Sequence, residues 1–262
     1  MNAVTPSAHT PVRLSEQETQ QLSAQFQGKP PQQLLKWASE KFGSGLTVCS
    51  SFQAEGVSII DMAWRVNPAI RVFTIDTGRT PQETYVLMDK IREKYGIEIE
   101  VYLPDAVEVE QMVKELGVNL FYKSITNRFM CCDVRKVHPL NKVLATRNID
   151  AWVAGLRRTQ GETRSKVGIV EFDKAHGGLV KLNPLAEWTS EQVWDYIKAN
   201  DVPYNELYDK GFTSIGCWPC TRAIKPGEDE RAGRWWWELD AAKECGINVD
   251  PRDVKASQAG QK

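Results

Sequence analysis

The chain has 262 residues, of which 42% are hydrophobic and 26% charged, and its formal net charge is −1. These fractions lie near the globular average and exclude a disordered or fibrous chain. The near-zero charge provides no electrostatic reason to expect nucleic acid or an anionic membrane as a partner. No apolar run approaches the roughly 20 residues of a membrane span, so we do not expect an integral membrane protein.

Residues 1–30 are rich in Gln, Ser, Thr and Pro, with neither the apolar core of a signal peptide nor a lipidation motif. We therefore expect a mobile N-terminal segment and a cytoplasmic protein whose thiols stay reduced. The six cysteines then need an explanation other than disulfides, and metal binding or catalysis is favoured. They are Cys49, Cys131, Cys132, Cys217, Cys220 and Cys245.

Strand and helix patterns alternate after residue 30. Apolar or alternating runs predict strands at residues 46–49, 70–75, 97–103, 152–154 and 179–182. Thr80 and Pro81 begin a helix pattern that stops at Gly96. Thr189 and Gln192 form the capping box of a second helix. This alternation predicts parallel βαβ units, which bind ligands at the carboxyl ends of their strands.

The character of the chain changes after Cys220, where Lys225-Pro226-Gly227 leads into charged residues and three tryptophans. We expect a main domain at residues 31–225, which binds the ligand, and a C-terminal tail at residues 226–262 that packs on or beside it. The tryptophans are expected to serve packing rather than ligand stacking.

Small hydroxyl residues follow two of the expected strands. Ser50 and Ser51 stand at a turn into a helix, where hydroxyl and backbone N–H groups can bind a phosphate. An ordinary serine N-cap is the alternative. Thr77 follows the second strand at the same edge, either in a binding crevice or in a plain strand-to-helix turn. The sequence contains neither the P-loop nor the G-x-G-x-x-G motif.

Two close pairs of cysteines predict a metal site. Cys217 and Cys220 form a C-x-x-C pair late in the chain, unlike a thioredoxin-type redox pair, and Cys131 and Cys132 are adjacent. Four thiolates suit zinc or an iron–sulfur cluster. The vicinal pair favours the cluster, because zinc sites prefer ligands two to four residues apart. Unrelated thiols are the remaining interpretation.

Cationic residues stand near these segments. Arg157 and Arg158 follow a strand, and Arg231 and Arg234 precede the tryptophans. Arginine forks match phosphate and sulfate oxygens bidentately, although each stretch alone is equally consistent with surface charge. Arg135 and Lys136 follow the vicinal cysteines, either on a solvated helix face or beside a cluster and an anionic substrate.

Four segments, in this order, resemble the assimilatory adenosine 5′-phosphosulfate reductases, the iron–sulfur type of the PAPS/APS reductase family. They are Cys131–Val137, Gly216–Arg222, Gly227–Trp235 and Lys243–Gly246. The resemblance runs from about residue 30 to residue 248, and the combination of paired cysteines with a terminal Glu-Cys-Gly makes it specific.

The resemblance implies a Rossmann-like, doubly wound, mostly parallel α/β sheet of the adenine nucleotide alpha hydrolase-like class. It also implies a 4Fe–4S cluster and reduction of adenosine 5′-phosphosulfate (APS) to sulfite and AMP for cysteine biosynthesis, with thioredoxin as reductant. The implied cluster ligands are Cys131, Cys132, Cys217 and Cys220. The implied nucleophile is Cys245 on the tail, which would carry an S-sulfo-cysteine intermediate.

The resemblance also implies substrate contacts. Lys136, Arg231 and Arg234 would hold the phosphosulfate. The nucleotide site would be lined by Ser50, Ser51 and Thr77, with Arg157 and Arg158 in a flexible loop beside it.

One departure is that the family usually closes with Cys-Gly-Leu-His, whereas this chain has Ile247 and Asn248 after Cys245 and Gly246. The terminal imidazole is therefore missing or replaced. Two other interpretations stay open: a reductase of the 3′-phosphorylated substrate (PAPS), and a four-cysteine zinc protein that binds RNA or protein through its tail. The sequence leaves open whether the chain forms a homo-oligomer.

Overall fold

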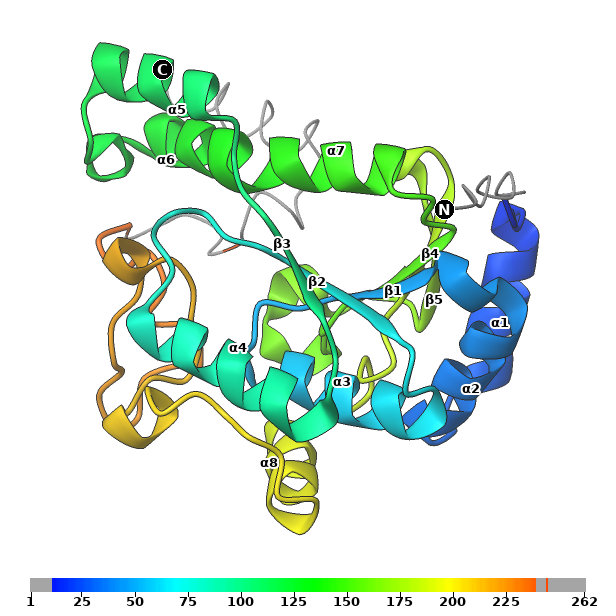
Figure 1. Cartoon of the computed structure of the whole chain (residues 1–262). Coiled ribbons are helices and arrows are strands. Elements are labelled where there is room, and N and C mark those ends of the chain that lie inside the picture. The colour runs from blue at the N-terminus through cyan, green and yellow to red at the C-terminus, as the bar shows by residue number, and fades with distance from the viewer. Residues whose placement is uncertain (1–10, 239–243, 245–262) are drawn as a thin grey trace, which may run out of the picture.

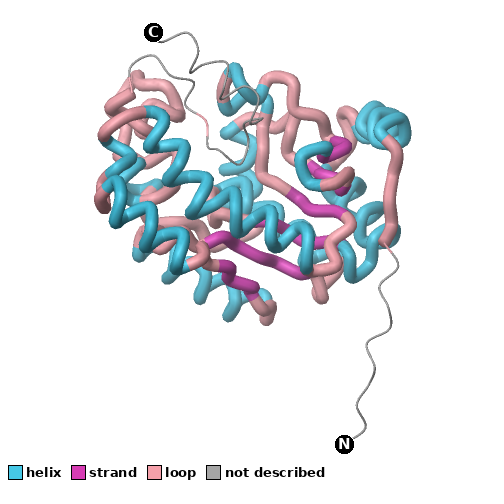
Figure 2. Tube along the Cα trace, turned by 90° about the horizontal axis from the view of Figure 1, so that it is seen from above, coloured by secondary structure: helices cyan, strands magenta, loops and turns pink. Residues whose placement is uncertain are grey.

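The computed structural model describes residues 11–238 and 244, which form a sheet with helices on both faces (Figures 1 and 2). The strands are β1 (Leu46–Cys49), β2 (Arg71–Ile75), β3 (Ile99–Tyr102), β4 (Ala151–Val153), β5 (Val170–Asp173) and β6 (Leu179–Leu182). The helices are α1 (Glu16–Phe26), α2 (Pro31–Phe42), α3 (Ala54–Val66), α4 (Gln82–Tyr95), α5 (Ala106–Leu116), α6 (Ile125–Cys132), α7 (His138–Thr146) and α8 (Ser190–Ala199).

The six strands lie in the order β3-β2-β1-β4-β6-β5, and every pair except β5 with β6 is parallel. The chain passes from β1 to β2 and β3 on one side and then to β4 and β6 on the other. The strand order therefore reverses between β1 and β4, which is where open α/β sheets bind ligands. The predicted parallel α/β sheet is confirmed. Only the antiparallel edge strand β5 was not predicted.

Alternate residues of the central strands enter two cores. Val72 and Val153 pack with the core that contains α2, α3 and α8, on one face of the sheet. Phe73 and Trp152 pack against Leu140 of α7 on the other face. Because both faces are covered, the central strands β1 (LTVC) and β4 (AWV) are mostly apolar, which made them recognisable as short buried runs.

Residues 11–30 differ from the expected mobile segment. Ser15 caps α1 in a capping box with Glu18, and Leu14 and Phe26 are buried in the core. Helix α1 contacts the edge strand β5. The polar composition of this segment gave no indication that Leu14 and Phe26 are buried. Burial of each side chain contributes roughly 1.5–3 kcal/mol to stability. Residues 1–10 lie outside the described part.

The two predicted helix starts have different outcomes. Thr189 and Gln192 form the capping box of α8, as expected. Helix α4 instead has Pro81 at its N-cap, because the Thr80 hydroxyl donates to Asp76 rather than capping the helix. Gly96 ends α4 in the left-handed conformation, with φ of 63°. Within residues 11–238, no helix has the length and apolar character needed to cross a membrane.

Candidate functional site

The turn after β1 is tightly built around Ser50. Its N–H donates to the Phe73 carbonyl at 3.0 Å, and its Oγ accepts from the Phe52 N–H at 3.0 Å. Gly56 packs directly on this hydroxyl, since a Cβ at that position would lie 2.5 Å from Oγ. Ser51 is exposed and accepts a hydrogen bond from Gln53. The predicted hydroxyl pair therefore splits into one buried turn residue and one accessible residue.

The edge of β2 meets the C-x-x-C segment. Thr77 is buried, and its Oγ1 lies 3.3 Å from the Cys217 Sγ. The Trp218 N–H donates to the Arg79 carbonyl at 2.8 Å, which ties the same two segments together. A pocket at this junction is lined by Ser51, Asp76, Thr80, Tyr85, Lys136 and Cys217, among others. The structure thus joins the expected nucleotide edge to one of the cysteine pairs.

The four paired cysteines line one further pocket. Cys131 and Cys132 end α6, where the helix continues through a π-helical turn at Asp133–Val137 into α7. Such π turns are frequent at functional sites. The pocket is lined by Cys131, Cys132, Cys217, Cys220, Arg79, Arg128, Arg135, Lys136, Phe121 and Pro219. The fold therefore brings together two cysteine pairs that are more than eighty positions apart in the sequence.

Burial raises the pKa of the thiols at Cys131 and Cys220, in the latter case to about 12, and the neighbouring Cys217 adds to both shifts. Arg135 opposes the rise at Cys131, and Arg234 opposes it at Cys220. A raised pKa favours the neutral thiol over the thiolate. Metal ligation requires thiolates, so a bound metal would instead favour the deprotonated form of these cysteines.

The donor set fits an iron–sulfur cluster. Four soft thiols share one pocket with cations that can balance the charge of a thiolate-ligated cluster. Two buried guanidinium nitrogens near them, Nε of Arg135 and of Arg234, have no hydrogen-bond partner within the described residues. In that same part of the chain, no three His, Cys, Asp or Glu side chains converge as ligands of a single metal ion. A cluster distributes its thiolates over several irons and does not need such convergence.

The two arginines predicted ahead of the tryptophans are both buried, and Arg234 lies near Cys220 of the cysteine pocket. Arg234 is buried and lies over the Trp235 ring, with its guanidinium carbon 4.5 Å from the ring centroid. Gly216 makes room for it, because a Cβ there would lie 2.2 Å from Arg234 Nη2. Arg231 is also buried, and its Nη2 lies 3.4 Å from Glu244 Oε1. Trp235 is packed with Cys131 and Cys220, as expected for a packing residue.

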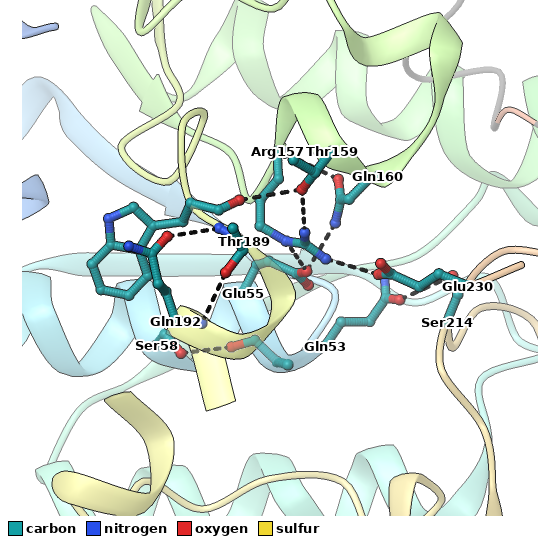
Figure 3. Close-up of polar contacts among 12 residues, drawn as sticks. Gln53, Glu55, Ser58, Arg157, Thr159, Gln160, Thr189, Gln192, Ser214 and Glu230 are labelled. Carbon is teal, nitrogen blue, oxygen red and sulfur yellow. Dashed lines mark hydrogen bonds and ion pairs between the residues drawn. The ribbon is translucent and has the colours of Figure 1, made fainter. Parts of the chain in front are cut away.

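Arg157 and Arg158 differ from the expected flexible loop. Figure 3 shows Arg157 between Glu55 and Glu230, to which its Nε and Nη2 donate at 2.8 Å each. Its side chain is only 1% exposed and is paired with both carboxylates, so the structure shows it held in place rather than in a flexible loop. Arg158 donates to the Val167 carbonyl and to Glu187, which also holds it in place. The position of Arg157 is thus set by the carboxylates of Glu55 and Glu230, which are distant from it in the sequence.

Sequence reasoning missed three cations of this region. Arg128 precedes Cys131 and Cys132 by one helical turn, so its spacing was an available signal. Arg79 follows Thr77 by two positions and lines the cysteine pocket. Arg164 is bound to Glu244, a contact that no local pattern indicates. Cys245 lies outside the described residues.

Known proteins are similar to this chain over most of its length. Residues 45–223 match the phosphoadenosine phosphosulfate reductase domain. The chain is 45% identical over 233 residues to the adenosine 5′-phosphosulfate reductase of Pseudomonas aeruginosa (strain LESB58), covering 87% of this chain and 85% of that protein. It is 48% identical over 200 residues to the enzyme of the same name from Burkholderia cepacia, covering 76% and 79%. The crystal structure of phosphoadenylyl-sulfate (PAPS) reductase from Candida auris is similar, with a TM-score of 0.70 and 29% identity over 81% of this chain and 100% of that chain.

Proposed function

The chain belongs to the phosphoadenosine phosphosulfate reductase family, and from that premise we propose that it reduces APS to sulfite and AMP in sulfate assimilation, with thioredoxin as the electron donor. The observation that carries the proposal is the 3.3 Å contact between Thr77 Oγ1 and Cys217 Sγ. It joins the ligand-binding edge of an adenine-nucleotide fold to a pocket lined by four cysteines. We also propose that the protein is cytoplasmic, because the cytoplasm keeps the dithiol of a reductant such as thioredoxin reduced.

The substrate has two parts, an adenosine and a phosphosulfate, and the site offers suitable groups for each. Its adenosine would occupy the crevice at the carboxyl ends of β1 and β2, near Ser51 and Thr77. Its phosphosulfate would extend toward Lys136, Arg231 and Arg234. Arginine forks bind such oxyanions bidentately, and Lys136 lines both pockets.

Cys131, Cys132, Cys217 and Cys220 would hold a 4Fe–4S cluster. Bound there, it would supply a redox-active centre with negative charge beside the substrate site. Arg79, Arg128 and Arg135 line the same pocket and would balance that charge.

Cys245 would act as the nucleophile. Its thiolate attacks the sulfur of the substrate, so that a sulfur–sulfur bond forms while the sulfur–oxygen bond to AMP breaks. Arg231 and Arg234 would stabilise the charge that develops on the leaving phosphate. A thioredoxin thiolate then attacks Cys245 Sγ and releases sulfite, and the second thiol of thioredoxin resolves the mixed disulfide. Two electrons thus pass from the dithiol to the sulfur.

Mass spectrometry after mixing the protein with APS but without thioredoxin tests this mechanism. We expect one sulfonate adduct on Cys245, and we expect Cys245→Ser to abolish sulfite formation while iron content and substrate binding persist. An adduct on another residue, or turnover that survives in Cys245→Ser, would reject the mechanism.

A second candidate substrate is PAPS, because the structurally similar Candida auris enzyme is a PAPS reductase. We favour APS, since the relatives at 45–48% identity are named for it. A 3′-phosphate would also need cations beyond those assigned to the phosphosulfate. Measuring kcat/KM for both substrates decides between them, and an equal or higher value for PAPS would contradict the choice of APS.

A further inference from the structure

Glu244, the residue before Cys245, carries a deeply buried carboxylate. Its side chain is 2% exposed. Charged side chains almost never reach such burial unless they are paired, because an uncompensated charge loses its hydration. The groups that compensate Glu244 therefore show what this part of the chain is attached to.

The carboxylate is bound on both oxygens. Arg164 donates from Nε to Oε2 and from Nη2 to Oε1, each at 2.7 Å, which is a bidentate fork. Thr163 Oγ1 donates to Oε2 at 3.2 Å, and Arg231 Nη2 lies 3.4 Å from Oε1. Thr163 and Arg164 belong to the loop between β4 and β5, in a short 3₁₀ turn at Glu162–Arg164. The side chain of Glu244 is thus fixed to this loop.

The backbone of Glu244 is held by a second cation. Its carbonyl accepts from Arg128 Nη1 at 3.1 Å. Arg128 is itself fully buried and forms a bidentate pair with Glu238, at 2.8 and 3.0 Å. Because the side chain and the peptide carbonyl are bound to different elements, both the position and the direction of the chain at residue 244 are set.

These contacts place Glu244 between the two parts of the proposed site. Arg128 lines the cysteine pocket, and Arg231 is one of the arginines assigned to the phosphosulfate. Cys245 is the next residue in the sequence, one peptide unit beyond Glu244. We propose that Glu244 is a positioning residue that anchors the C-terminal segment and so directs the Cys245 thiol to the sulfur of the substrate. This inference rests on the proposed function, in which Cys245 is the nucleophile.

An ion pair that only stabilises the fold would have a different signature. Its loss would lower stability but leave the rate of sulfur transfer per folded molecule unchanged. Loss of an anchor would free the chain at Lys243 and Glu244 and slow sulfur transfer, because a displacement of about 1 Å in a reacting group can reduce a rate 100-fold. Substrate affinity would not fall, since Arg231 keeps its charge.

The test compares Glu244→Gln with Glu100→Gln in the full-length, cluster-loaded protein. Glu100 is the control for a bidentate ion pair outside the site: it pairs with Arg71, both side chains are 29% exposed, and neither residue lines the cysteine pocket. Arg71 also donates to the carbonyls of Ser44 and Arg147. Two rates are measured: trypsin cleavage at the Lys243–Glu244 bond, and formation of the Cys245 adduct in a single turnover at saturating APS. The dissociation constant of APS is determined in parallel.

In Glu244→Gln we expect cleavage at Lys243 to become at least about tenfold faster, since cleavage follows local opening. We expect adduct formation to slow by about 10–100-fold with an unchanged dissociation constant, whereas Glu100→Gln changes neither rate. Unchanged cleavage, or faster cleavage with an unchanged adduct rate, overturns the proposal.

If Glu244→Gln does not fold, Glu244→Asp keeps the charge and shortens the reach, and Arg164→Lys keeps the charge without the fork. Both should show intermediate changes in the two rates, and wild-type rates in both overturn the proposal. If the wild-type protein forms no adduct on Cys245, the proposed function fails by itself. Faster cleavage of Glu244→Gln still supports the anchor in that case, and unchanged cleavage overturns it.

Discussion

The ionic cluster around Glu55 and the pocket lined by the four paired cysteines are both built at the edge of the sheet where ligands are expected, but they differ in completeness. Glu55 accepts from Arg157 and Gln160, and Arg157 also binds Thr159 and Glu230, so the cluster is satisfied by the chain itself (Figure 3).

The cysteine pocket holds buried thiols, and the nearby guanidinium nitrogens Nε of Arg135 and of Arg234 lack a partner within the described residues. Buried polar groups in native structures are nearly always bonded, so exceptions call for an explanation such as a ligand or ion. At the satisfied cluster the chain itself neutralises the arginine, whereas at the pocket two guanidinium nitrogens are left that the bound group we propose could satisfy.

The largest effect is expected from removing a thiol of the pocket. Cys220→Ser should lower iron and acid-labile sulfide from about four of each per chain to background, because a cluster needs all its cysteine ligands. Both are measured in protein purified anaerobically, with Cys49→Ala as the control that keeps iron. Stoichiometric zinc without iron in the wild-type protein would show that the pocket is a zinc site instead.

The next largest effect is expected at the satisfied cluster. Arg157→Met should lower the free energy of unfolding by about 3–5 kcal/mol, because it leaves the buried Glu55 carboxylate without its cation. The matched control is the neighbouring Arg158→Met, whose pair with Glu187 is about one third exposed and should contribute about 0–1 kcal/mol. Urea denaturation followed by circular dichroism measures both. A raised KM for APS without loss of stability would instead make Arg157 a substrate contact.

A smaller effect is expected at Gly216. In Gly216→Ala the new Cβ would displace the Arg234 guanidinium, the far end of a flexible side chain, rather than the backbone. We expect KM for APS to rise about tenfold, the equivalent of one charge-assisted hydrogen bond, with little change in melting temperature. Adding Gly216→Ala to Arg234→Gln should cause no further rise, because both act on one group. Additive effects would show that Gly216 acts through something other than Arg234.

The smallest functional effect is expected at Cys49. Burial raises the pKa of its thiol to about 12, and only the thiolate reacts with alkylating agents. At pH 8 the thiolate is therefore scarce, so iodoacetamide should leave Cys49 unmodified in the native protein and modify it after denaturation. Peptide mapping measures both states, and Cys49→Ala should retain full turnover. Rapid native alkylation would mean that Cys49 belongs to the reactive part of the site.

Much of the fold was predictable because its signals are local. The buried runs at β1 and β2 and the capping box of α8 depend on neighbours within a few residues, and all three are present. Local signals failed where another partner competed, whether it was near or distant in the chain. The Thr80 hydroxyl binds Asp76 instead of capping α4, and Leu14 and Phe26 hold a polar segment against the core.

For the site, residue types and spacing pointed to the four paired cysteines, which the structure places around one pocket. The arginines were chosen as residues that suit oxyanion chemistry, and their roles remain proposals. Their separate roles depend on which groups face them across the fold. Arg157 and Arg234 are both arginines in short basic stretches, yet the first is neutralised by Glu55 and Glu230 and the second lies over Trp235. Sequence thus determined which chemistry is available. The tertiary structure alone decided where each charge is satisfied, because carboxylates and thiols distant in the chain meet only when the sheet and its loops are assembled.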